Sequence, residues 1–91
     1  MGEARRQVTI VNKRGLHARA SAKFVSAVAQ MEGSEVRVSN DGGSAAGGSI
    51  LGLMMLGAAK GDAVEVCVSG AQADERLAEL CAMIEDGFGE D

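Results

Sequence analysis

The 91-residue sequence contains no proline, tryptophan or tyrosine, and it has only two phenylalanines and one histidine. With so few aromatic rings, a protein offers almost no surface on which nucleobases stack. The formal net charge of −4 also disfavours binding to a polyanion. We therefore expect no nucleic-acid partner, and a core built from Val, Leu, Ile, Met and Ala.

Long apolar runs are also absent. No stretch approaches the length that a membrane span needs, and the first residues lack the hydrophobic region of a secretion signal, so we expect a cytoplasmic protein that makes no membrane contact. The two cysteines, Cys67 and Cys81, stand 14 positions apart without the paired spacing of a zinc ribbon or a disulfide framework. We expect both to be small buried side chains, and we expect neither a metal nor a cofactor.

The chain is long enough for one domain, residues 1–91, and too short for two. Apolar residues alternate in some segments, as in half-buried strands, and recur every three or four positions in others, as in helices. An Asp-Gly pair at 41–42 indicates a hairpin turn. The predicted elements are strands at 7–12 and 34–39, a weak edge strand within 42–49, a helix at 50–56, a strand at 62–69, and helices at 18–31 and 72–86.

This β-α-β-β-α-β-α order predicts an α/β (α+β) fold, an open-faced sandwich with a four-stranded antiparallel sheet and three helices on one face. The strand at 62–69 places its valines on one face and Cys67 on the other. Cys81 falls on the apolar stripe of the last helix, so the two thiols are poorly placed to pair.

His17, the only histidine, lies in "KRGLHARAS", at the predicted start of a helix. The first amides of a helix lack partners within it and, with the helix dipole, attract anions. The first 23 residues hold six basic residues and one acidic residue, whereas the last 18 hold seven acidic residues and one basic residue. A neutral imidazole is a competent nucleophile, so the pattern favours a ring that carries a phosphoryl group. The basic residues near it in sequence are Lys13, Arg14, Arg19 and Lys23.

Two motifs, "GLHARAS" and "GSILGLMMLGAAKGD", closely resemble the HPr family, the histidine phosphocarriers of the bacterial phosphoenolpyruvate-dependent phosphotransferase system. The resemblance runs from about Gln7 to Ile84. It implies that His17 accepts a phosphoryl group on Nδ1 from enzyme I and passes it to EIIA-type domains, with Arg19 stabilising the phosphate. The protein would then be a monomeric carrier and not an enzyme.

One residue departs from the family pattern. Proline usually follows the arginine of the motif, and Ala20 stands there in this chain. Proline in the first helical turn mainly fixes φ, so alanine keeps the helix and leaves the ring less sharply oriented.

The second motif supplies a regulatory site and a docking surface. Ser49 is placed to cap the helix at 50–56, and the resemblance implies that an HPr kinase/phosphorylase phosphorylates it. That helix is apolar all round, so if Leu53 and Leu56 face the core, other apolar side chains are exposed. The predicted partner-binding residues are Ile50, Leu51, Met54, Ala18 and Ala20.

Three alternatives stay open. His17 could be an ordinary solvated capping residue. The protein could be a regulatory paralogue in a nitrogen-related branch that acts mainly as a protein-binding module. A small metal site using His17, Cys67 and Cys81 fits less well, because these residues lie on different elements and no fourth ligand is evident.

Overall fold

The computed structural model describes residues 2–90 and contains the predicted elements in the predicted order. A short terminal 3₁₀ turn, η1, follows the last helix and was not predicted. The elements are β1 (Gly2–Thr9), α1 (Ala18–Ala29), β2 (Ser34–Asn40), β3 (Gly43–Ala46), α2 (Ile50–Met55), β4 (Ala63–Gly70), α3 (Ala73–Glu85) and η1 (Gly87–Gly89).

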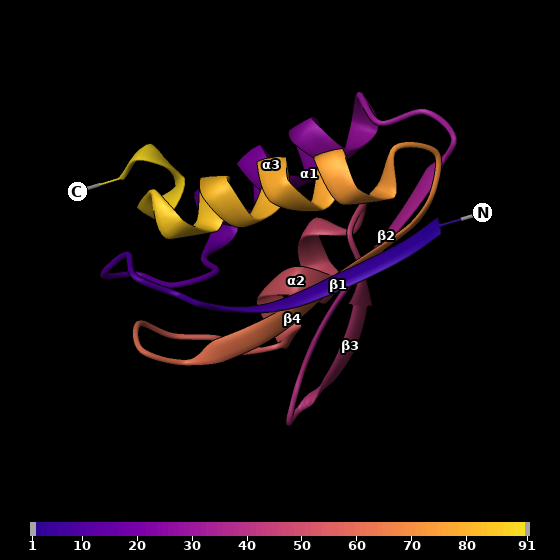
Figure 1. Cartoon of the computed structure of the whole chain (residues 1–91). Helices are drawn as coiled ribbons and strands as arrows, with labels where there is room; N and C mark the ends of the chain where they lie inside the picture. The colour runs from indigo at the N-terminus through magenta and orange to yellow at the C-terminus, as the bar shows by residue number, and fades with distance from the viewer. Residues whose placement is uncertain (1, 91) are drawn as a thin grey trace.

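The four strands form one antiparallel sheet in the order β1-β4-β2-β3 (Figure 1). The strand β4, which has the clearest alternation in the sequence, lies between β1 and β2. The weak strand β3 lies at the edge and pairs with β2 around a two-residue turn, Asp41-Gly42, where Asn40 faces Gly43. The predicted hairpin and edge strand are thus confirmed.

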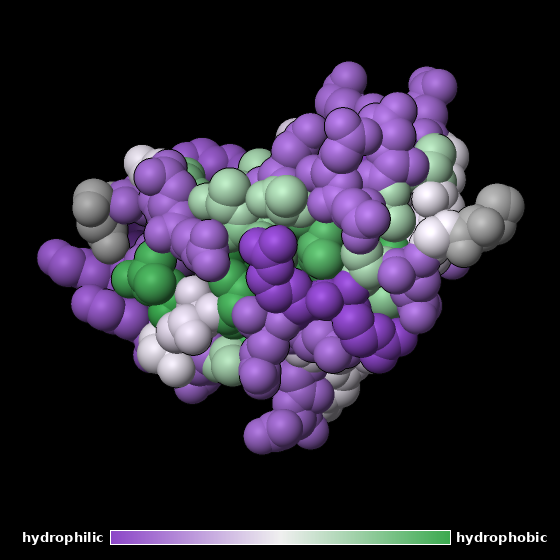
Figure 2. Space-filling view, in the orientation of Figure 1, coloured by the Kyte–Doolittle hydropathy of each residue, from purple (hydrophilic) through white to green (hydrophobic). Residues whose placement is uncertain are grey.

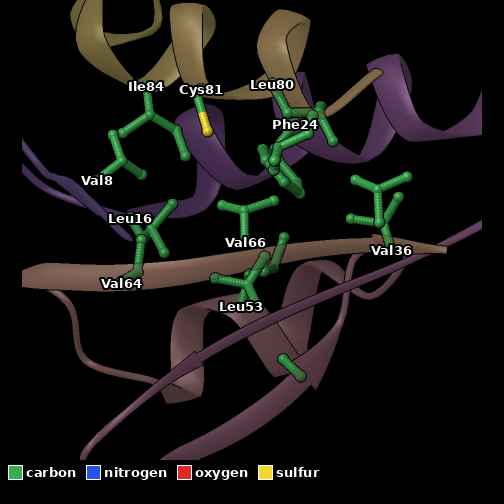
Figure 3. Close-up of a cluster of buried hydrophobic side chains, with 14 of the residues drawn as sticks. Val8, Leu16, Phe24, Val36, Leu53, Val64, Val66, Leu80, Cys81 and Ile84 are labelled. Atoms are coloured by element: carbon green, nitrogen blue, oxygen red, sulfur yellow. The ribbon is translucent and has the colours of Figure 1, made fainter. Parts of the chain in front are cut away.

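The helices and one face of the sheet share a single core (Figure 3). The three alternate valines of β4 are buried on that face, where they meet Phe24 from α1 and Leu53 from α2. The helix α3 presents its apolar stripe to the same core, and apolar atoms show mainly in a band between α3 and the sheet (Figure 2). The predicted open-faced architecture is confirmed. The buried residues of the α3 stripe include Leu77, Leu80, Cys81 and Ile84.

The first strand differs from its prediction. It was expected at 7–12, but it begins at Gly2 and ends at Thr9. Ala4 and Val8 are buried against the helices, but Arg6, which lies between them on the same face, is exposed and charged and interrupts the apolar alternation. After Thr9 the chain leaves the sheet, and Asn12 is buried in the turn that leads to α1.

The two cysteines are free and lie on opposite sides of the sheet, as predicted. Cys81 is fully buried, and the lack of solvent raises the pKa of its thiol. Cys67 is half-buried on the open face opposite Arg5 and Arg37, and burial also raises its pKa. The prediction that both cysteines are buried is correct for Cys81 only. Cys67 is half-buried because no helix covers its face of the sheet. Among residues 2–90, no helix has the length and apolar character to cross a membrane.

Candidate functional site

His17 is the N-cap of α1, as the sequence predicts. Its backbone is extended, with φ −75° and ψ −178°, and its Nδ1 accepts a hydrogen bond from the Arg19 amide at 3.2 Å. An imidazole nitrogen therefore satisfies one of the helix amides that would otherwise lack a partner. The hydrogen bond requires a lone pair on Nδ1, so the neutral ring carries its proton on Nε2.

A tight loop places His17 at the N-terminus of α1. The amide of Gly15 donates to the Asn12 carbonyl at 3.1 Å, and the Asn12 side chain donates to the Gly15 carbonyl at 2.9 Å. Gly15 has φ +64°, and Leu16, which is buried, donates its amide to Ala58 at 3.0 Å. The role of Asn12 was missed in the sequence, although an asparagine three residues before a glycine is a common turn signal.

The structure also places Glu90 at this site, which the sequence does not predict. Its carboxylate contacts Arg19 and Lys23, which we call the basic cluster. Its Oε1 is 3.1 Å from Nε2 of His17, and its Oε2 accepts from Nε of Arg19 at 2.8 Å. A second Arg19 nitrogen, Nη2, donates to Oε1 at 3.3 Å, and Nζ of Lys23 lies 3.3 Å from Oε2. The arginine therefore holds the carboxylate with two donors, the strongest form of this pair. The sequence places Glu90 in an acidic C-terminal region and gives no signal of this contact.

The residues before Glu90 carry it to His17. Gly87, Phe88 and Gly89 all have left-handed backbone angles, which reverse the chain at the end of α3. The Phe88 ring is buried in the core, and its carbonyl accepts from Nζ of Lys23 at 2.8 Å. We call residues 87–90 the C-terminal strap.

The site strongly favours the ionised form of Glu90. The hydrogen bond from Arg19, with smaller contributions from Lys23, lowers the pKa of Glu90 from 4.5 to about 2. The same contact raises the pKa of Arg19. The basic cluster thus binds a carboxylate well and prefers it charged.

This shift predicts how the strap contact depends on pH. Because the pKa is lowered on folding, Glu90 contributes stability that is fully present above pH 4.5 and is lost as the pH falls toward 2. The groups that face it are His17, Arg19 and Lys23. We expect the native protein to have a higher Tm than Glu90→Gln at pH 6, and the gap to close between pH 4.5 and 2. A gap that stays constant down to pH 2 would contradict the contact.

The apolar side chains at residues 50–56 divide into a buried group and an exposed group, as the sequence predicts. Leu53 and Leu56 are buried, whereas Ile50, Leu51 and Met54 are exposed, as expected. Met55 was missed, although among residues 2–90 it is the most exposed of the large apolar side chains, at 77%. A helix that is apolar all round gives no sequence signal for which residues face outward.

Ala18 and Ala20 were also predicted to contact partners. Ala18 is exposed. Ala20 is fully buried on the side of α1 that faces the core, so its side chain cannot contact a partner and that prediction is wrong. The periodicity explains the result, because Ala20 lies four positions before Phe24 on the buried side of the helix.

Ser49 is the N-cap of α2, and its Oγ accepts a hydrogen bond from the Gly52 amide at 2.9 Å. The predicted structural role is confirmed. The side chain is partly exposed.

One surface cleft lies away from the His17 site. A polar cleft of about 340 Å³ lies beside the β2–β3 turn and the end of α2, and its lining does not include His17. Within the described part of the chain, no three His, Cys, Asp or Glu residues are grouped as metal ligands. His17, Cys67 and Cys81 lie on three different elements, so the metal-site alternative gains no support.

Comparisons with known proteins agree on one family. A family model described as "PTS HPr component phosphorylation site" matches residues 4–86. The chain is 44% identical over 86 residues to phosphocarrier protein HPr of Neisseria meningitidis serogroup A, covering 94% of this chain and 96% of the relative. It is 40% identical over 85 residues to phosphocarrier protein NPr of Escherichia coli K12, covering 92% and 93%.

A solved structure, HPr-C-His from Thermoanaerobacter tengcongensis, has the same fold. It superposes with a TM-score of 0.87 at 35% identity, covering 100% of this chain and 99% of that one.

Proposed function

This chain belongs to the HPr family of phosphocarrier proteins, and on that premise we propose that His17 carries the phosphoryl group. Members of this family carry a phosphoryl group between partners and are not enzymes themselves. The observation that carries the proposal is the binding of an anion beside the ring of His17 by Arg19 and Lys23. A site that holds a carboxylate in this way has the charge and the donors to hold a phosphate.

In the proposed reaction, the lone pair on Nδ1 of His17 attacks phosphorus in the phosphohistidine of enzyme I. The new N–P bond forms as the donor N–P bond breaks, and its electron pair returns to the donor imidazole, so phosphate and charge balance without a separate base. The proton on Nε2 stays in place. The Arg19 amide, which now donates to Nδ1 at 3.2 Å, is released to a phosphoryl oxygen.

The test is transfer from phosphoenolpyruvate through enzyme I to the purified protein. We expect acid-labile phosphate on the protein. When an EIIA-type domain is added, this phosphate should move from the protein to that domain. Failure to accept the group from any enzyme I would contradict the carrier role.

We propose that the docking patch, Ile50, Leu51 and Met54, is where both partners bind. The patch lies on α2, which packs against α1, and exposed apolar side chains of this kind suit more than one partner. The exposure of Ala18 at the start of α1 is consistent with the same surface.

Leu51→Glu tests the patch. Leu51 is 68% exposed, so the substitution leaves the core intact, and we expect unfolding free energy to change by less than about 0.5 kcal/mol. The apparent Kd for enzyme I should rise by about tenfold or more, because a charge replaces an apolar contact at the interface. Titration of transfer rate against enzyme I concentration measures it.

The matched control is Ala78→Glu, which adds the same charge at an exposed position of α3. It should leave the apparent Kd within about twofold of the native value, since a rim or remote charge has a small effect. Equal losses in the two variants would show that overall charge, and not the patch, governs binding.

The relatives include both HPr and NPr proteins, so two branches are candidates. We propose the sugar branch first, because the HPr relatives are 41% to 45% identical to this chain, against 36% and 40% for the NPr relatives. A regulatory nitrogen-branch protein is the alternative. Comparing transfer rates from the enzyme I of each branch separates them, since a strong preference for the nitrogen-branch enzyme would overturn our choice. Either role places the protein in the cytoplasm with its partners.

Phosphorylation of Ser49 stays a prediction. A phosphate there would meet the first amides of α2 but would also put negative charge beside the docking patch, so we expect it to weaken binding of enzyme I. Acid-stable label from ATP and an HPr kinase/phosphorylase, lost in Ser49→Ala, would support it. Absence of label on the native protein would contradict it.

A further inference from the structure

We propose that the C-terminal strap is an autoinhibitory contact, in which Glu90 occupies the phosphate-binding cations of the unphosphorylated protein and has to leave before a phosphoryl group can use them. The inference rests on the proposed function, because it assigns the same cations to the phosphoryl group on His17.

The first argument is occupancy. Both Nε and Nη2 of Arg19 donate to Glu90, and Nζ of Lys23 also lies against it. The Glu90 side chain is only 8% exposed, whereas Arg19 and Lys23 are 64% and 44% exposed. The carboxylate is therefore enclosed by the basic side chains that the proposed function gives to phosphate.

The second argument is charge. A phosphoryl group brings a charge of about −1.5 to −2 at neutral pH, and on Nδ1 it would lie across a single imidazole ring from the carboxylate at Nε2. Two anions on one small cation cluster repel each other. Arg19 would then have two possible acceptors, the Glu90 carboxylate and the phosphoryl group. It would bind the phosphoryl group, which carries more charge and is covalently attached to the ring. Release of Glu90 is the direct way to relieve the repulsion.

The third argument is that the strap can open locally. The buried Phe88 ring anchors it, while Gly89, at φ +72°, has no Cβ to restrict its rotation, and the Glu90 amide donates to the Gly87 carbonyl at 3.0 Å, a single bond that opening would break. Rotation about Gly89 swings Glu90 away from His17 without removing Phe88 from the core. Phe88 itself has φ +59°, which is unfavourable for a residue with a side chain, so its conformation depends on that burial.

The test measures affinity for inorganic phosphate, by NMR titration of the side-chain signals of His17 and Arg19. We expect Glu90→Gln and Glu90→Ala to bind phosphate about tenfold more tightly than the native protein, since the competing charge is gone. Asp86→Asn, which removes an exposed acidic charge four residues earlier, should change affinity by less than about twofold.

Unchanged or weaker phosphate binding in both Glu90 variants, or an equal gain in Asp86→Asn, would overturn the inference. Phosphoryl transfer from enzyme I, measured on the same samples, keeps the two proposals apart. A gain in phosphate affinity without any transfer would leave the strap contact standing and remove the carrier role. Normal transfer with no change in phosphate affinity would support the carrier role and overturn the autoinhibitory role of the strap.

Discussion

His17→Asn is expected to abolish phosphoryl transfer from enzyme I. Asparagine keeps a side-chain acceptor at the N-cap, where His17 now receives the Arg19 amide, but it has no nucleophilic nitrogen. We expect the acid-labile label to fall by at least about 10³-fold, to background, because no other histidine is present to take it. Incubation with labelled phosphoenolpyruvate and enzyme I, followed by acid lability, measures the result.

The choice of asparagine matters for the interpretation. His17→Ala also removes the nucleophile, but it removes the helix cap as well and should cost about 1 kcal/mol of stability. Comparing unfolding of the two variants separates capping from chemistry. If folded His17→Asn still carried the label, the phosphoryl group would be bound to another residue, and the proposed role of His17 would be wrong.

Gly15→Ala is the second change expected to have a large effect. Gly15 has φ +64°, and a Cβ built there would lie 2.4 Å from the Ala58 carbonyl oxygen and 2.9 Å from the Ala59 Cα. Both are backbone atoms, so they cannot move aside as a flexible side chain would. The loop that holds His17 has to shift, and the Leu16 amide loses its bond to Ala58. We expect a loss of about 3 kcal/mol or more in unfolding free energy, together with slower transfer.

Gly57→Ala is the matched control. Gly57 has nearly the same φ, +66°, but a Cβ there meets no atom within 4 Å. It should lose only the backbone penalty, about 1–2 kcal/mol. Urea unfolding of both variants measures the difference, and equal losses would show that the close approach to Ala58 is unimportant.

Predictions that rest on neighbouring residues succeeded where the pattern was strong. The β2–β3 hairpin follows from Asp41-Gly42, and the start of α2 follows from Ser49. The first strand was misplaced because Arg6 lies on the same face as Ala4 and Val8 and interrupts the apolar alternation. Ala20 was misassigned to partner binding because it was placed by its motif and not by its helical face.

The sequence by itself determined the order of elements, the apolar faces and the position of the only imidazole at a helix start, because all of these depend on residues within a turn or two of each other. Only the tertiary structure decided that Glu90, 73 residues away, lies on His17. That contact depends on the direction in which α3 packs, on burial of Phe88 and on the reversal at residues 87–89. In the sequence the basic and acidic ends are far apart, and only folding brings their charges together.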